Sequence, residues 1–303
     1  MSTSSAARER INALLDENSF VEIGALVSAR ATDFNLKQID TPSDGCITGY
    51  GVINDSLVYV YAQDASVLNG SIGEMHAKKI CNLYDMAMKM GAPVIGLIDS
   101  CGLRLQEATD ALNAMGEMYM KQTLASGVIP QITAVFGNCG GGLALVPSLT
   151  DFTFMEETNA KLFVNSPNTL EGNSAEKCDT ASAKFQSEES GIVDFVGKED
   201  EILANIRELV SFLPANNEEE AEFVDCEDDL NRASAAIGTS YKDAKLAFSD
   251  LADDYNFIEV KAGYAKDMVT GFIKLNGTTI GCVGNRSVVY DEDGKEAEKF
   301  EGI

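Results

Sequence analysis

In the first part of the chain, the spacing of apolar residues changes from helical to strand-like. Between Ala6 and Glu17, apolar residues recur every three to four positions among charged ones, which predicts a short amphipathic helix. β-Branched and aromatic residues then dominate residues 20–27 and 46–63, a composition that favours strands. Asn54-Asp55 interrupts the second of these segments and predicts a hairpin turn.

From residue 64 onward, segments of helical periodicity alternate with short, continuous apolar runs. Helical spacing from Ile72 to Met90 ends at Gly91, a typical C-terminal signal, and a second helix is predicted from Glu107 to Ser126. The apolar runs, which have the length and composition of strands buried inside a sheet, are residues 93–99, 129–136 and 161–165. Strands that alternate with helices predict an α/β architecture.

An acidic segment divides the chain. Eight of the twelve residues from Glu218 to Asp229 are acidic, a pattern typical of a solvated linker. We therefore expect a first domain over residues 1–214, a linker with a helix over residues 215–250, and the start of a second domain over residues 251–303.

A weak internal repeat connects the two domains. Residues 256–260 echo residues 19–23, and residues 271–277 echo residues 49–55 in the same order. A repeated opening predicts a second copy of the same fold. The second copy is expected to be incomplete, because no later helices or glycine turn follow it, and its strand edges are expected to require a partner or self-association.

Charge and cysteine content narrow the class of protein. The 303-residue chain has a formal net charge of -25, which argues against nucleic acid and anionic membranes as partners. No apolar run approaches the roughly 20 residues that span a bilayer, so membrane insertion is not expected. Seven cysteines without a C-x-x-C pair, and no signal peptide, favour reduced thiols in a cytoplasmic protein without a metal site.

The strongest local motif is a glycine-rich segment, Gly137–Gly142, after a predicted buried strand. Consecutive glycines at the start of a helix leave N–H groups that can bind negative charge developing on an oxygen atom. A tight turn with no function is the alternative interpretation.

Two further turns are candidates for ligand contacts. Asp99–Arg104 follows the neighbouring strand, and open α/β sheets bind ligands where such strand ends meet. Asn69–Gly73, which includes Gly70 and Ser71, opens the helix that carries Lys78 and could bind phosphate through helix-start amides. An ordinary N-cap loop would have the same composition.

Two other features point away from catalysis. His76 is the only histidine, so a Ser-His-Asp triad is impossible, and a packed or surface role is expected for it. Ala87–Met90 has the residues of the tetrapeptide that carries covalent biotin. Lys89 lies at a predicted helix end rather than at an exposed hairpin tip, so we interpret this match as accidental.

Several ordered blocks of sequence resemble a known family. Residues 69–79, 91–107, 125–131 and 137–154 are similar to the β subunits of propionyl-CoA and related acyl-CoA carboxylases, and to the carboxyltransferase subunits of methylmalonyl-CoA decarboxylases. The resemblance covers nearly the whole chain. It implies a crotonase-like ββα spiral, with an incomplete second copy, and transfer of a carboxyl group between carboxybiotin and a short acyl-CoA, in either direction.

The resemblance also implies roles for particular residues. The backbone N–H groups of Gly141 and Gly142 would stabilise the enolate oxygen of the thioester. The residues expected to shape the pocket for CoA and the acyl group are Ser100, Cys101, Gly102, Arg104 and Gly140, with Gly70, Ser71 and Lys78 as further substrate contacts. Biotin would arrive on a separate carrier protein, and its ureido group would serve as the base.

The chain departs from the family pattern at informative places. Cys101 and Leu103 replace a glycine and an alanine in the usual Ser-Gly-Gly-Ala-Arg turn, which predicts a reshaped acyl pocket. Asp194 stands where a histidine is common. Because the biotin-side half is missing, we expect a separate biotin-side carboxyltransferase subunit and a homo- or hetero-oligomer.

Two other functions remain open at this point. The chain could be a non-catalytic CoA-binding or assembly subunit. It could also be a stand-alone crotonase-type isomerase or hydratase that uses Glu107 or Asp151 as its base, since a fold alone does not select a reaction.

Overall fold

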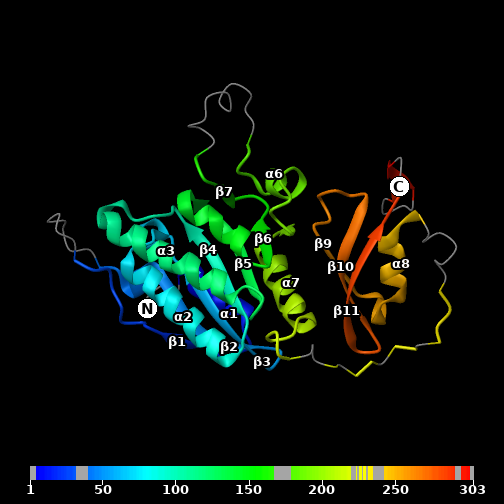
Figure 1. The fold of residues 1–303 in the computed structure, drawn as a ribbon, viewed down its shortest axis with the longest axis horizontal. Helices are drawn as coiled ribbons and strands as arrows, with labels where there is room; N and C mark the ends of the chain where they lie inside the picture. The colour runs from blue at the N-terminus through cyan, green and yellow to red at the C-terminus, as the bar shows by residue number, and fades with distance from the viewer. Residues whose placement is uncertain are drawn as a thin grey trace.

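A computed structural model describes residues 5–31, 40–166, 179–219, 223, 225–226, 228–229, 231–234, 242–290 and 295–300. Its main element is an eight-stranded sheet, ordered β1-β2-β3-β4-β5-β6-β8 with β7 beside β5 (Figure 1). The strands are β1 Val21–Ile23, β2 Cys46–Ile53, β3 Ser56–Gln63, β4 Val94–Ser100, β5 Gln131–Gly140, β6 Phe152–Glu156, β7 Lys161–Phe163 and β8 Phe195–Gly197. The first three strands pair antiparallel, and the pairs from β3 onward are parallel.

Helices cover both faces of this sheet. The main ones are α1 Ala6–Leu14, α2 Glu74–Met90, α3 Ala108–Ala125 and α7 Glu199–Phe212, with the shorter α4 Val146–Leu149 and α6 Ala183–Glu188. Successive residues of a strand point to opposite faces, so Tyr59 and Tyr61 of β3 pack with α2 and α3 while Val58 and Val60 pack with α1 and α7. The predicted α/β architecture is confirmed as a three-layer arrangement.

The hairpin turn and the helix end that the sequence predicted are confirmed by their backbone angles. Asn54 and Asp55 have φ of 49° and 67°, the left-handed pair that a two-residue hairpin requires. Gly91 ends α2 with φ of 65°. Lys89 lies in the last turn of α2, a helical context rather than a hairpin tip. The boundaries of the first predicted elements were too wide, because Leu15 is already extended and only Val21–Ile23 pairs with β2.

The glycine-rich segment is mostly strand rather than turn. β5 continues to Gly140, because Cys139 and Gly140 pair with β7 on one side and Cys139 pairs with Ser100 on the other. The prediction of a turn over Gly137–Gly140 is therefore wrong. A short 3₁₀ turn begins only at Gly141 and ends at Leu145.

The second unit repeats the opening of the first. It contains α8 Ala244–Leu251, β9 Phe257–Val260, β10 Met268–Leu275, β11 Thr278–Asn285, β12 Val288–Tyr290 and β13 Glu296–Lys299. Glu22 pairs with Gly49 between β1 and β2, and Glu259 pairs with Gly271 between β9 and β10. The sequence repeat is thus confirmed as a repeat of strand order and register.

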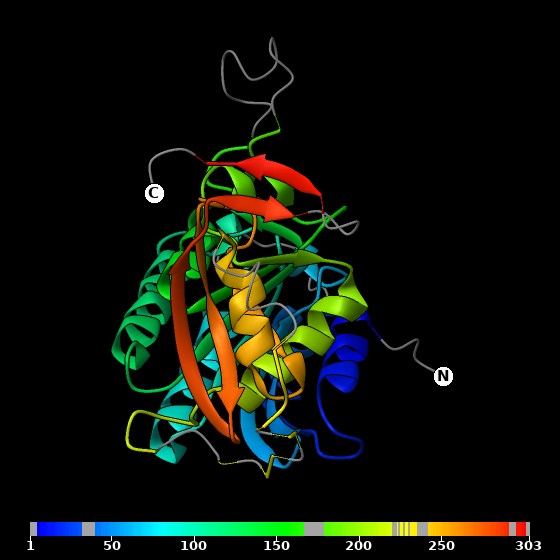
Figure 2. The same cartoon turned by 90° about the vertical axis from the view of Figure 1, so that its right-hand side faces the viewer.

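Helix α8 packs on β9, β10 and β11, so it belongs with the second unit as α1 belongs with the first (Figure 2). The second unit also contacts the first, where Lys261 lies 3.0 Å from the Asp194 carboxylate. Much of the predicted linker lies outside the described residues. Among the helices that are described, none is both long and apolar enough to cross a lipid bilayer.

Candidate functional site

Two predicted turns meet where β4 and β5 end. The strands run parallel from the pair Val94–Gln131 to the pair Ser100–Cys139, so their carboxyl ends lie side by side. Gly102 has φ of +99°, and a Cβ atom there would lie 2.5 Å from the Gly140 carbonyl oxygen. Only glycine permits this close approach of the two turns.

The third predicted segment joins the same place. The Cys101 N–H donates to the Asn69 carbonyl (3.1 Å), and the Ile72 N–H donates to the Gly102 carbonyl (2.8 Å). Gly70 has φ of +64°, and a side chain there would collide with the Asp99 carbonyl oxygen. The structure therefore brings together three segments that the sequence singled out separately, residues 69–73, 99–104 and 140–142.

The amides of Gly141 and Gly142 are available in this arrangement. As the first two residues of a 3₁₀ turn, they have no acceptor within it. Neither N–H donates to any other residue that the structure describes. Gly142 is exposed and Gly141 half-buried, beside the exposed Cys101. The Tyr119 hydroxyl donates to the Gly142 carbonyl at 2.6 Å, which fixes the orientation of the turn.

Arg104 faces the protein interior rather than this exposed surface. Its side chain is 4% exposed and lies 2.6 Å from the Asp44 carboxylate and 2.9 Å from that of Glu107. The guanidinium also donates to the Ser71 carbonyl at 2.7 Å and to the Ser71 hydroxyl at 3.2 Å. Arg104 is therefore a support for the 69–72 loop, because its buried guanidinium is bonded to Ser71 of that loop.

The two carboxylates beside Arg104 accept hydrogen bonds from amides in the first turn of α2. Glu107 accepts from the Glu74 N–H (2.7 Å), and Asp44 accepts from the His76 N–H (2.8 Å). Burial raises the pKa of Asp44, while Arg104 opposes this shift. The prediction that amides at the start of α2 bind phosphate is wrong for the N–H groups of Glu74 and His76. Each already donates to a carboxylate of the protein.

His76 and Lys78 have different surroundings. Burial lowers the pKa of His76 to about 3, and its ring contacts Gln63 and the Asp44 carbonyl. Of the two expected roles, packed or surface, the structure shows the packed one. Lys78 is exposed on α2 and pairs with Glu74 at 2.6 Å. A surface pair of this kind contributes about 1 kcal/mol or less, so Lys78 can exchange this partner for a ligand at little cost.

Asp151 and Glu107, the two carboxylates suggested as the base of an isomerase or hydratase, are not available at the glycine turn. Asp151 accepts from the Gln131 N–H (2.8 Å), which places it at the amino end of β5, the opposite end of the strand from Gly140. Glu107 is buried and bound to Arg104 and to the start of α2. Neither residue is a candidate base at the turn in this geometry.

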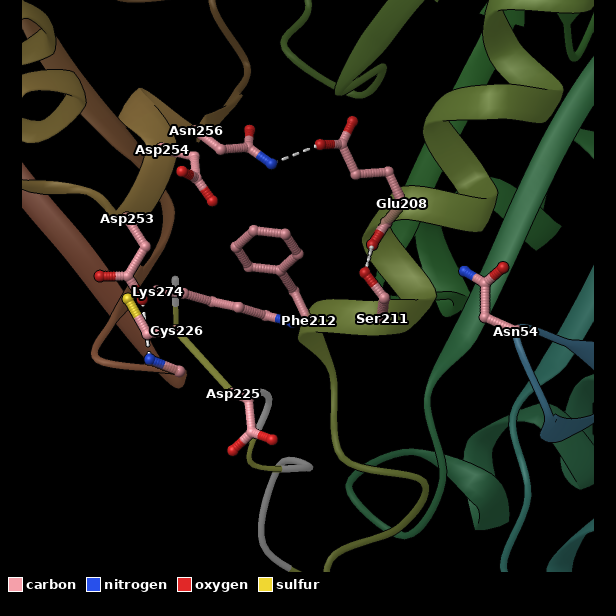
Figure 3. A pocket seen from close by; sticks show the side chains of 11 residues that line it. Asn54, Glu208, Ser211, Phe212, Asp225, Cys226, Asp253, Asp254, Asn256 and Lys274 are labelled. Atoms are coloured by element: carbon pink, nitrogen blue, oxygen red, sulfur yellow. Dashed lines mark hydrogen bonds between the residues drawn. The ribbon is translucent and has the colours of Figure 1, made fainter. Parts of the chain in front are cut away.

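A separate cavity of about 400 Å³ lies between α7 and the second unit (Figure 3). Glu208 accepts from Asn256 across it at 2.7 Å, and Lys274 lies 4.9 Å from the centre of the Phe212 ring. Its other charged lining residues are Asp225, Asp253 and Asp254. This acidic lining disfavours an anionic ligand and shares no residue with the glycine turn.

Sequence reasoning missed two supporting residues. Asp44 accepts a hydrogen bond from Arg104, which is 60 positions later in the sequence. Tyr119 donates one to the Gly142 carbonyl, which is 23 positions later. Asp44 lies in a short 3₁₀ segment and Tyr119 within α3, and neither belongs to a recognisable motif. Only the folded arrangement identifies them.

Comparisons with known proteins agree with this geometry. A family model described as carboxyl transferase domain matches residues 3–297. The propionyl-CoA carboxylase beta chain of Roseobacter denitrificans is 41% identical over 294 residues, covering 93% of this chain and 58% of that protein. The methylmalonyl-CoA decarboxylase subunit alpha of Propionigenium modestum is 40% identical, covering 93% and 57% respectively.

Solved structures show the same fold. The transcarboxylase 12S structure with hydrolysed methylmalonyl-coenzyme A bound superimposes with a TM-score of 0.86 at 35% identity, covering 92% of this chain and 57% of that one. The expected crotonase-like fold is confirmed. The chain spans somewhat more than half the length of these relatives. With a family model that matches almost all of its residues and the same arrangement of strands, the chain belongs to the carboxyl transferase domain family.

Proposed function

We propose that this chain is the CoA side of a biotin-dependent carboxyltransferase that acts on a short acyl-CoA. The observation that carries the proposal is the pair of unoccupied amides at Gly141 and Gly142, on an exposed turn at the carboxyl ends of parallel strands. The names of the similar proteins support the substrate class, because they act on propionyl-CoA or methylmalonyl-CoA.

The chemistry follows from where negative charge develops. When the bond between the α-carbon and a carboxyl group breaks or forms, its electron pair is shared with the thioester carbonyl, whose oxygen becomes negative. Two amides that converge on this oxygen stabilise the developing charge without reorganising. Removing one such donor typically lowers the rate by ~10²–10³.

The acyl end of the substrate is proposed to contact Cys101. The residue is exposed beside the glycine turn, and its N–H is held by Asn69. Leu103 packs against the hydrophobic core instead, so its larger side chain fills the interior rather than the pocket. Of the two departures from the family pattern, Cys101 is therefore the one proposed to influence acyl specificity. Ser100, Gly102 and Gly140 would position the turns around it.

Biotin supplies a ring nitrogen that carries the carboxyl group in such enzymes. The described residues do not show a biotin site, because no described strand pairs with the outer side of β11 and no described residues of the second unit form a turn like Gly141–Gly142. We propose that a biotin carrier protein and a biotin-side polypeptide complete an oligomeric enzyme, with residues 1–214 as the acyl-CoA domain.

Calorimetry with propionyl-CoA, followed by decarboxylation of methylmalonyl-CoA, tests the proposal. The assay contains free biotin and the part of the Roseobacter denitrificans beta chain that lies outside the matched stretch. Gly141→Ala forces a side chain onto a residue with φ of +64°, which displaces the amide pair, and is expected to lower kcat about 100-fold or more.

Gly116→Ala is the matched control, since a Cβ atom at this helical glycine meets nothing within 4 Å and the activity should be unchanged. Equal activity in Gly141→Ala and wild type would refute the role of the amide pair. Propionyl-CoA binding without turnover would instead favour a non-catalytic CoA-binding or assembly subunit.

A further inference from the structure

Helix α3 begins at a residue whose backbone is strained. Ala108 has φ of 45° and ψ of -122°. These angles are close to those of the first central residue of a type II′ turn, a position where glycine predominates because it has no Cβ atom. Asp44 and Asn69 also have positive φ, but their ψ angles of 37° and 33° lie in the ordinary left-handed region. The Ala108 side chain is exposed, so burial of its methyl group does not offset the strain.

Bonds on the N-terminal side of Ala108 fix the direction in which the chain enters α3. The Ala108 N–H donates to the Leu105 carbonyl and closes a short 3₁₀ turn. The buried Glu107 carboxylate accepts hydrogen bonds from the Glu74 N–H at 2.7 Å and from Arg104 at 2.9 Å. The backbone is therefore already fixed where it reaches Ala108.

Contacts on the C-terminal side fix the direction of the helix. The Asp110 carboxylate lies 2.7 Å from Arg30, and Ala111 and Ala114 are buried against the core. Because both sides are held, the change of direction is confined to Ala108. A strained conformation of this kind persists only where the surrounding structure imposes it.

Helix α3 also carries two side chains that support Gly142. A Cβ atom at Gly142 would lie 2.8 Å from both Met115 Sδ and the Tyr119 hydroxyl oxygen. Met115 is 2% exposed, and the Tyr119 hydroxyl donates to the Gly142 carbonyl at 2.6 Å. Both side chains therefore press on the turn that presents the amide pair, and the position of the Gly142 N–H depends on the direction of α3.

The length of α3 amplifies small rotations at its start. The helix rises about 16 Å between Ala108 and Tyr119, so a rotation of about 5° at Ala108 would move Tyr119 by roughly 1.4 Å. A displacement of about 1 Å at a reacting centre can lower a rate about 100-fold. The angles of one residue are therefore sufficient to control the amide pair.

We infer that Ala108 is a positioning residue. Its strained backbone sets the direction of α3, and α3 places the Gly142 amide beside that of Gly141 through Met115 and Tyr119. The functional element is the backbone conformation rather than the methyl group, so a residue that adopts these angles preserves the site and one that resists them displaces it. The consequence for catalysis rests on the proposed function, whereas the control of the glycine turn by α3 does not.

Ala108→Gly tests the strain. Glycine adopts the observed angles freely, so the midpoint of thermal unfolding should rise by about 2 °C or more. Ala204→Gly is the matched control, because Ala204 is exposed in the regular part of α7. There the same substitution loses helix propensity and should lower the midpoint by about 2–4 °C.

Ala108→Val tests the positioning. Valine is strongly disfavoured at positive φ, and at this exposed position it acts through the backbone rather than through a clash with the core. Fluorine NMR of the chain labelled with fluorotyrosine reports on the contact with Gly142, and Tyr119→Phe assigns the resonance of Tyr119. We expect this resonance to shift or broaden in Ala108→Val and to stay unchanged in Ala108→Gly. Ala108→Leu, which is less restricted, replaces the valine variant if that variant does not fold, with the same direction of change.

Activity is a separate readout, measured by the decarboxylation of methylmalonyl-CoA. Ala108→Val should lower kcat about 100-fold with KM changed less than about threefold, because the amide pair acts on charge that develops in the transition state. Ala108→Gly should keep kcat within about twofold. A merely structural role would lower the unfolding midpoint and leave the kcat of the folded protein unchanged.

Three results would overturn the inference. They are a midpoint in Ala108→Gly lowered as in Ala204→Gly, a Tyr119 resonance that Ala108→Val leaves in place, and a displaced Tyr119 with unchanged kcat in an active enzyme. Absence of decarboxylation by the wild-type chain would instead contradict the proposed function. The unfolding and NMR measurements on the chain alone would then still decide whether Ala108 controls the glycine turn.

Discussion

At the scale of single residues, the main finding is a buried charge cluster beneath the candidate site. Arg104 joins Asp44 and Glu107, and its guanidinium also holds Ser71 of the neighbouring loop. The cluster lies under the loops rather than among ligand-facing groups. Its effect on a substrate is therefore indirect, through the positions of Gly70 and Gly102.

Arg104→Met is expected to destabilise the fold by about 3–5 kcal/mol, because it leaves two carboxylates buried without their cation. The measurement is urea unfolding at pH 7. Arg104→Lys keeps the charge but not the bonds to Ser71, and should recover part of this loss. Equal stability of all three proteins would show that the cluster is not coupled to folding.

The pH dependence of this variant follows from Asp44, which faces Arg104, Glu107, His76 and Lys79. Burial already raises its pKa, and Arg104 lowers it, so loss of Arg104 raises the pKa further. A carboxyl group with a raised pKa in the folded state favours folding at low pH, and this contribution is lost as pH rises through that pKa. The deficit of Arg104→Met relative to wild type should therefore shrink as pH falls from 8 toward 5, and a constant deficit would argue against Asp44 as its source.

Tyr119→Phe tests how the glycine turn is held. The variant loses the hydroxyl that donates to the Gly142 carbonyl but keeps the ring packed against the core. We expect a decrease in kcat of roughly tenfold, with stability lowered by about 1 kcal/mol, because one hydrogen bond is lost. A steady-state assay measures the effect on kcat, and thermal unfolding measures the effect on stability. A loss of stability with unchanged kcat would show that Tyr119 does not position the glycine turn.

At the scale of elements, the repeated hairpins show why glycine is required at matching places. Gly49 of β2 and Gly271 of β10 both face the backbone of the preceding strand, at the carbonyls of Val21 and Ile258. A side chain there would push the shorter strand off the sheet. Thr48 and Thr270, one position earlier, each donate a hydroxyl hydrogen bond across the same pair of strands.

Gly271→Ala should therefore destabilise the second unit by about 1–3 kcal/mol, the usual range for overpacking. Gly281→Ala is the control on the adjacent strand, where a methyl group meets open space. Thermal unfolding measures both, and hydrogen exchange at β9 shows whether that strand is released. Equal effects of the two substitutions would mean that the Ile258 carbonyl shifts to accommodate the methyl group at little cost in stability.

At the scale of the whole molecule, polar contacts and the packing of Phe272 on Phe152 hold the second unit against the first. The Asp194 carboxylate accepts from the Thr153 N–H at 2.6 Å and pairs with Lys261. Burial raises the pKa of Asp194, and Lys261 opposes that shift. The acidic cavity of Figure 3 lies along the same contact between the units.

Lys261→Met should loosen the second unit selectively. Because Lys261 is partly exposed, we expect a loss of about 1–2 kcal/mol rather than the value for a fully buried pair. Limited proteolysis should cleave more quickly between residues 215 and 243, while the α2–α3 core stays protected. Lys266→Met, which removes an exposed pair with Glu298, is the matched control. Equal cleavage rates would mean that apolar contacts alone join the units.

Much of the local structure could be predicted because it depends on neighbouring residues. The turn at Asn54-Asp55 and the end of α2 at Gly91 follow from backbone preference and periodicity. The repeat was also visible in sequence, since equivalent strands need the same small and apolar residues. These features required no knowledge of contacts between distant segments.

Only the tertiary structure decided where the candidate site begins and which charges support it. β5 extends to Gly140 because β7, some twenty residues later, adds to its edge. Asp151 lies at the far end of the same strand, and Arg104 turns inward to Asp44. Sequence by itself determined the elements and the glycine motif. The fold determined the rest, because strand pairing and buried ion pairs join residues that chain order leaves far apart.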